Sequence, residues 1–245
     1  MTRGIAASRG RPALHEVVVA ALIVLALMAI FLVAPNEETM GSVQRIMYVH
    51  IAVAWLGLLG MVVVAAMGLM YLARRGLTWD HAAQAAAEQG WLCCTLTLVT
   101  GSLWASEAWN TWWTWDPRLT SVFVLWLIYS GYLLMRANVE DPQRRARLGA
   151  VVAIFGAIDI PLVVMATRWF RGIHPVSPRM EPMMRVVLLL TAVSFTAFFA
   201  LLVFRRWKQL GLERLVASME RCWENGETIR FSSGALNPRS SQEEF

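Results

Sequence analysis

Six long apolar stretches alternate with short polar segments along the 245-residue chain. They lie near residues 17–34, 46–73, 89–106, 119–135, 148–167 and 186–204. A helix needs roughly 20 apolar residues to cross a bilayer core of about 30 Å, and a lipid-exposed backbone must satisfy its hydrogen bonds internally. The pattern therefore predicts an all-α integral membrane protein with six transmembrane helices.

The composition supports a membrane protein and argues against other classes. The chain is 57% hydrophobic and 16% charged, whereas soluble domains average roughly 25% charged residues, which argues against a water-soluble enzyme. The 22 basic residues are scattered between the apolar runs, which argues against a nucleic-acid partner. The first span follows Arg3, Arg9 and Arg11 as a signal peptide would, but its apolar run is longer than usual and five spans follow. We therefore expect a retained helix.

The distribution of arginine and lysine predicts the orientation of the helices. Cytoplasmic loops carry an excess of these residues, and with the N-terminus inside, most of those near span ends fall on the inner side. We therefore expect an N-in, C-in topology. Four outer arginines depart from this bias and flank the loop between the fifth and sixth spans: Arg168, Arg171, Arg179 and Arg185. They either bind an anion or extend from helix ends toward the headgroups.

The pattern divides the chain into a six-helix membrane domain, residues 1–210, and a cytoplasmic tail, residues 211–245. Within 206–224, apolar residues recur at helical spacing and predict an amphipathic helix: Leu212, Leu215, Val216, Met219 and Trp223. From Ser232 onward the tail is polar, and we expect it to be disordered.

A tryptophan-rich loop between the third and fourth spans lies on the outer side in this topology. Five of the 12 tryptophans fall within 12 positions: Trp104, Trp109, Trp112, Trp113 and Trp115. An aromatic belt accounts for one or two tryptophans per span end, whereas several flat indole faces suit a large, flat, largely apolar ligand. Arg118 would pair with carboxylates on such a ligand. Asp116 either caps the helix that Pro117 begins or takes part in binding.

Two histidines flank this loop on the outer side: His50 in the opening turns of the second span, and His174 between the fifth and sixth spans. Taken alone, either one is more often a hydrogen-bonded interfacial side chain than a ligand. Together, two neutral imidazoles from separate helices are able to ligate one haem iron from both faces. A haem would also supply the flat face and the carboxylates that the loop suits. A closed zinc site would need four clustered ligands, which the outer side does not offer.

Other reactive residues have simpler interpretations. Cys93 and Cys94 are either small helix residues or a redox pair, and no disulfide framework is implied. The sequence has no CxxCH, so covalent attachment of haem to this chain is not encoded. Asp159 lies inside a span, where an acidic residue is a functional candidate. Because Pro161 frees a backbone carbonyl here, we favour a structural role for Asp159 at a kink.

The loop and its histidines resemble the haem-handling membrane proteins of cytochrome c maturation, most closely the haem exporter protein C (CcmC) family. The segment WNTWWTWDPRLTS, residues 109–121, resembles the WWD signature of that family. The flanking histidines match His50 in YVHIAVAWLG and His174 in RWFRGIHP. The resemblance covers roughly residues 15–210 and includes the six-span plan. Asn110 and Ala105 stand where glycine is usual, and asparagine tolerates a left-handed backbone at such a turn.

The resemblance implies a non-covalently bound haem b at the periplasmic face of a bacterial inner membrane, with His50 and His174 as axial ligands. The five tryptophans, Asp116, Arg118 and Arg171 would surround the haem. The resemblance also implies delivery of haem to the haem chaperone CcmE, with the ABC transporter subunits CcmA and CcmB and the small membrane protein CcmD as further partners. The chain has no P-loop motif, so any ATP-driven step would belong to a partner.

Two other functions are compatible with the residues. Haem lyase-type ligases, which attach haem to proteins, come from related families that share the Trp-rich loop, although they generally have more spans and further histidines. The second alternative is a structural membrane subunit whose tryptophans form a broad aromatic belt. Within the favoured function, the chain either assists covalent attachment of haem to the chaperone or only presents the haem.

Overall fold

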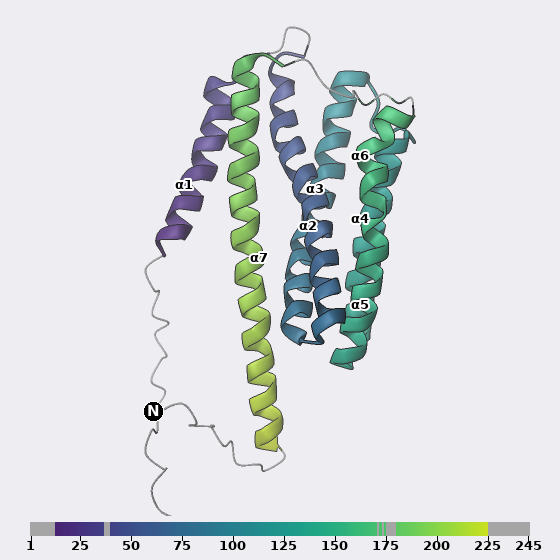
Figure 1. Ribbon diagram of the computed structural model, residues 1–245. Coiled ribbons are helices and arrows are strands. Elements are labelled where there is room, and N and C mark those ends of the chain that lie inside the picture. The colour runs from purple at the N-terminus through teal and green to yellow at the C-terminus, as the bar shows by residue number, and fades with distance from the viewer. Residues whose placement is uncertain (1–12, 37–39, 171, 173, 175–179, 225–245) are drawn as a thin grey trace, which may run out of the picture. The chain divides into compact units, whose positions relative to one another are not determined.

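The computed structural model describes residues 13–36, 40–170, 172, 174 and 180–224. Within these residues every regular element is a helix (Figure 1), which confirms the all-α prediction. The elements are α1 (Leu14–Met28), the π-helical turn η1 (Ala29–Val33), the 3-10 turn η2 (Ser42–Gln44), α2 (Arg45–Arg74), α3 (Leu77–Trp109), α4 (Pro117–Asn138), α5 (Pro142–Ala157), α6 (Asp159–Trp169) and α7 (Pro182–Glu224).

Among the described residues, five helical segments are long and apolar enough to cross a membrane: Leu14–Val33, Ser42–Arg74, Pro117–Asn138, Pro142–Trp169 and Pro182–Glu224. The chain is therefore a multi-pass membrane protein. The third span expected from the sequence belongs to α3, which is not in this set. That helix begins at Leu77 rather than near residue 89, and its first turns carry Asp80, Gln84 and Glu88. The number of spans is six only if α3 also crosses the membrane.

The helices α2 and α3 pack closely because small residues meet in their contact. A Cβ on Gly60 would lie 3.0 Å from Gly90 Cα, and a Cβ on Gly57 would lie 2.8 Å from Cys94 Sγ. Tyr129 of α4 closes over this contact and donates a hydrogen bond of 3.0 Å to the carbonyl of Gly57. Small residues at helix contacts are typical of membrane proteins, since they let backbones approach. The position of Cys94 here agrees with its interpretation as a small packing residue.

A buried ion pair joins the first turns of α3 to the last turns of α4. Arg136 donates hydrogen bonds to the two carboxylate oxygens of Asp80 at 2.6 and 2.9 Å, and another to Gln84 Oε1 at 2.8 Å. Arg136 is 5% exposed and Asp80 is 3% exposed. Because these bonds satisfy the polar side chains of α3, the helix extends to Leu77 despite its lower hydropathy. The sequence pattern assigns Arg136 to the inner side but does not indicate its partner.

The fifth predicted span consists of two helices, α5 and α6, which meet at Ile158. Pro161 has no N–H to donate to the carbonyl of Ala157, so the helical ladder is interrupted where the kink is expected. Asp159 begins α6 and is buried, and its Oδ2 has no hydrogen-bond partner within the described part of the chain. A structural role for Asp159 at the kink stays a prediction.

The helix α7 continues the sixth predicted span into the helix expected over 206–224. The chain divides into two units, residues 1–207 and 208–245, and α7 belongs to both. In the second unit the apolar face predicted by the spacing is exposed: Leu212, Leu215, Val216, Met219 and Trp223. The segment from Ser232, expected to be disordered, lies outside the described residues.

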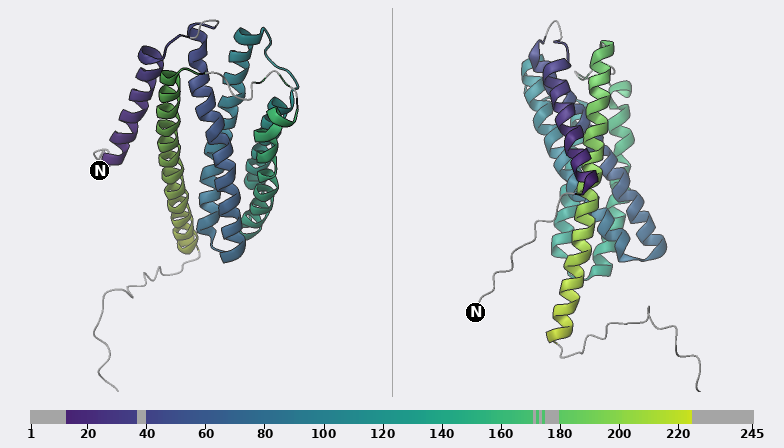
Figure 2. Two further views of the ribbon diagram at one scale, coloured as in Figure 1. Left: turned by 45° about the horizontal axis from the view of Figure 1, so that its top comes forward. Right: turned by 90° about the vertical axis from the view of Figure 1, so that its left-hand side faces the viewer.

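Within residues 1–207, α2 begins, α3 ends, α4 begins, α6 ends and α7 begins at the same end of the bundle (top of Figure 1). Figure 2 shows the same arrangement from two further directions. We call this the loop end. It carries the opening turns of α2 with His50, the connection between α3 and α4 with its tryptophans, and the segment after α6 with His174.

Candidate functional site

The connection between α3 and α4 is the Trp-rich loop, residues 110–116, and the local sequence fixes both of its ends. Asn110 ends α3 with a φ of 51°, and its N–H bonds to the carbonyl of Ala105; asparagine tolerates this left-handed conformation. Ala105 itself is helical, so the second departure from the family pattern affects no turn. The Asp116 carboxylate accepts a hydrogen bond of 2.9 Å from Leu119 N, and Pro117 takes the first helical position. The predicted cap of α4 is confirmed.

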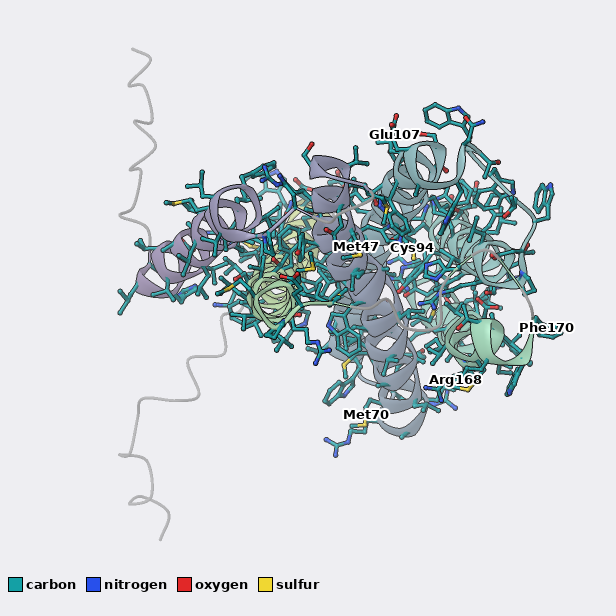
Figure 3. All side chains as sticks on the ribbon, turned by 90° about the horizontal axis from the view of Figure 1, so that it is seen from above. Met47, Met70, Cys94, Glu107, Arg168 and Phe170 are labelled. Carbon is teal, nitrogen blue, oxygen red and sulfur yellow. The ribbon has the colours of Figure 1, made fainter. Side chains whose placement is uncertain are left out.

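A cavity of about 270 Å³ lies between the helices at the loop end. Six of the residues predicted for the site line it: His50, Trp104, Trp109, Trp113, Arg118 and His174. The rest of the wall is mostly apolar and reaches Cys94, which Figure 3 shows near the middle of the bundle as seen from this end. Small-molecule sites are typically apolar hollows with a few well-placed polar groups. The cavity has this character.

His50 lies in the second turn of α2 and is half-buried against α3. Its Nδ1 lies 3.1 Å from Thr100 Oγ1. A Cβ on Gly101 would lie 2.9 Å from His50 Cε1, so the imidazole fits here because residue 101 is glycine. The sequence pattern does not indicate Thr100 or Gly101, since a contact between two helices leaves no periodic signal in either one.

His174 and two tryptophans form a row of ring contacts along the cavity. The Trp109 ring meets that of His174 edge to face, with centroids 6.4 Å apart, and meets Trp104 in the same manner at 5.0 Å. Aromatic rings prefer such edge-to-face geometry. Trp104 is 7% exposed and anchors the row in the bundle. The row therefore ties the histidine that follows α6 to the end of α3.

The five tryptophans do not all face the cavity. Trp112 and Trp115 are 63% and 73% exposed. They line a groove beside the cavity together with Leu98, Val99, Ser102, Leu103 and Phe123. Trp113 lines both hollows, and its ring meets Trp115 edge to face at 5.6 Å. The sequence predicts one loop surface, whereas Trp104 and Trp109 belong to α3 and face the cavity, and Trp112 and Trp115 of the loop face outward.

Arg118 places a positive charge at the wall of the cavity. Its backbone carbonyl accepts a hydrogen bond from Ser121, whereas its guanidinium donates none to the residues that the structure describes. The neighbouring Asp116 is buried. Its carboxylate lies close to the segment that bears His174: a Cβ on Gly172 would lie 2.7 Å from Asp116 Oδ2. Arg171, also predicted for the site, lies outside the described residues.

The sequence also matches proteins of known family. Residues 5–221 match the profile of CcmC, described as "Heme exporter protein C". The chain belongs to this family. The matched range extends from the N-terminal segment through most of α7 and includes every residue that lines the cavity. The resemblance read from the Trp-rich loop and the two histidines is thereby confirmed.

Individual members of the family support this assignment. The chain is 35% identical over 200 residues to "Heme exporter protein C" of Bradyrhizobium diazoefficiens, a match that covers 76% of this chain and 74% of the relative. It is 33% identical over 196 residues to the protein of that name in Paracoccus denitrificans, covering 76% and 81%. The Escherichia coli K12 protein of the same name is 31% identical over 184 residues, covering 72% and 74%.

Proposed function

We propose that this protein binds haem b non-covalently in the cavity at the loop end and delivers it to the haem chaperone CcmE during maturation of c-type cytochromes. The observation that carries the proposal is the shared lining of this cavity: His50 from α2 and His174 from the segment after α6 meet the same space as Arg118 and Trp109. Relatives named "Heme exporter protein C" support haem as the molecule handled.

The chemistry of the lining residues fits a haem. Neutral imidazole is a common axial ligand of haem iron, and His50 and His174 would supply one nitrogen each. Trp104, Trp109 and Trp113 offer flat apolar surface and exclude water. Arg118 would hold propionate oxygens through charge-assisted hydrogen bonds. A haem held here would offer its iron to the two imidazoles, and the lining side chains would orient it. Asp116 and Arg171 stay among the predicted surroundings of the haem, whereas Trp112 and Trp115 line the neighbouring groove.

We further propose six membrane crossings with both termini inside. The candidate spans α2 and α4 both run away from the loop end (Figure 1), so the chain between them must cross the same thickness in return. This crossing is α3, whose low hydropathy follows from polar residues paired within the bundle. The arginine distribution supports our proposal that the loop end lies outside, at the periplasmic face of the inner membrane.

The partners follow from the same proposal. Presenting haem at the outer face requires an acceptor there, for which we propose CcmE. We propose CcmA, CcmB and CcmD as companions in the membrane, and since the chain has no P-loop motif, nucleotide hydrolysis belongs to one of them. The exposed groove of Trp112 and Trp115 lies next to the cavity, where an acceptor would have access.

An absorption spectrum of the purified full chain, reconstituted with haem, tests the ligation. The wild-type protein is expected to show the Soret band of a low-spin, bis-histidine haem. His50→Ala and His174→Ala are each expected to lose the low-spin spectrum, because one axial ligand is missing. His15→Ala is the matched control, since its side chain is 62% exposed and lies near the start of α1.

The outcomes separate binding from ligation. A wild-type protein with no Soret band contradicts haem binding altogether. If both alanine variants keep an unchanged low-spin spectrum, the haem is bound by other ligands. Covalent haem on CcmE, measured in cells that carry each variant, tests delivery: His50→Ala and His174→Ala should abolish it and His15→Ala should not.

A further inference from the structure

Thr100 on α3 faces His50 on α2, and a second hydrogen bond of the Thr100 hydroxyl favours one proton arrangement between them. The Thr100 hydroxyl donates to the carbonyl of Leu96 at 2.6 Å. A hydroxyl carries one hydrogen and two acceptor lone pairs. With its hydrogen in this bond, Thr100 Oγ1 presents its lone pairs to His50 Nδ1, 3.1 Å away. The carbonyl of Thr97, on the same turn of α3, is a further acceptor for the ring.

This arrangement favours one tautomer of a neutral imidazole. With the hydrogen on Nδ1, the lone pair available for a metal is on Nε2. The ring also lies close against α3, because Gly101 leaves room for Cε1 where a Cβ would lie only 2.9 Å away. Thr100 and Gly101 together form what we call the histidine seat: one sets which nitrogen is protonated, and the other allows the ring to approach α3.

We propose that Thr100 is a positioning residue that holds His50 as the Nδ1–H tautomer, with Nε2 ready to ligate iron in the cavity. This inference rests on the proposed haem binding and goes beyond it by naming the group that prepares one ligand. Ligating histidines generally donate their other N–H to a fixed acceptor, and loss of that acceptor typically costs 10–100-fold in metal affinity. The Thr100 hydroxyl, which is hydrogen-bonded to the backbone of α3, is the acceptor for His50.

The test compares isosteric variants of the full chain. Thr100→Val removes the hydroxyl with little change in shape, and the dissociation constant for haem is expected to rise roughly 10–100-fold. The midpoint potential of the bound haem is expected to shift, because the basicity of His50 changes. Thr100→Ser keeps the hydroxyl and is expected to restore both values. Thr196→Val is the matched control: Thr196 makes the same backbone bond, to Ala192 at 2.7 Å, from α7.

A second measurement needs no haem. In protein labelled with ¹⁵N-histidine, the resonances that disappear in His50→Ala belong to His50. They should show protonation at Nδ1 in the wild type and lose this preference in Thr100→Val. Protonation at Nε2 in the wild type, or equal haem affinity and potential in Thr100→Val and wild type, would overturn the role of Thr100 alone. Failure of the wild type to bind haem would overturn the proposed function as well.

Discussion

At the scale of the residue, Arg118 is a charge in a mostly apolar cavity. Burying part of a guanidinium costs free energy unless an anion or acceptor compensates. We expect Arg118→Ala to weaken haem binding roughly tenfold to hundredfold, since a hydrogen bond to a charged group contributes about 1.5–3 kcal/mol. Arg118→Lys should bind haem with an affinity between those of the wild type and Arg118→Ala. Lysine keeps the positive charge but loses the planar guanidinium that donates two parallel hydrogen bonds. Haem titration of the purified variants measures this.

A second outer arginine provides the control for this prediction. Arg168, near the end of α6, is exposed and lies at the periphery in Figure 3. Arg168→Ala is therefore expected to bind haem as the wild type does. Equal binding by Arg118→Ala and wild type would show that Arg118 does not hold the carboxylates.

At the scale of the element, two helices begin in the same way at opposite ends of the bundle. Asp116 caps α4 through Leu119 N, and Asp141 caps α5 through Arg144 N at 2.6 Å, each followed by proline. Loss of such a cap typically costs about 1 kcal/mol. Asp116→Ala and Asp141→Ala are therefore each expected to lower the melting temperature by roughly 2–4 °C, measured by circular dichroism in detergent.

The asparagine variants separate capping from binding at Asp116. Asparagine caps as well as aspartate, so Asp116→Asn and Asp141→Asn should melt as the wild type does. If Asp116→Asn alone releases haem, the carboxylate also acts in binding. A drop in melting temperature for either asparagine variant would contradict the capping argument.

The apolar periods of the helices and the start of α4 were predictable because their causes are local. The apolar runs predict α2, α4 and the membrane part of α7, and Asp116-Pro117 predicts where α4 begins. The start of α3 was not predictable, since Asp80 is tolerated there only through Arg136, which lies far along the chain. Likewise, the spacing of the tryptophans does not distinguish Trp112 and Trp115, which are exposed in the loop, from Trp104, which is buried in α3.

At the scale of the whole molecule, the site could be anticipated only in part. Topology alone brings His50, the Trp-rich loop and His174 to one face, because helices that alternate in direction return their connections to the same side. The shape of the cavity and the histidine seat depend on how α2 and α3 pack, through Gly57, Gly60 and Gly90. That packing depends on pairs of residues in different helices, and single-helix patterns do not specify it.

The stability of the whole bundle should depend on the buried pair of Arg136 and Asp80, far from the loop end. Arg136→Met leaves the carboxylate buried without its partner, and is expected to cost about 3–5 kcal/mol.

The double variant Asp80→Leu with Arg136→Met removes both charges and should recover most of this loss, because two well-packed apolar side chains avoid the desolvation of the ions. Arg205→Met, which breaks the more exposed pair with Glu16, should cost far less. Denaturant unfolding followed by tryptophan fluorescence compares the three. A double variant as unstable as Arg136→Met would mean that the bundle needs the ion pair itself. Because the pair lies far from the cavity, the haem spectrum of the folded fraction should be unchanged in all three variants.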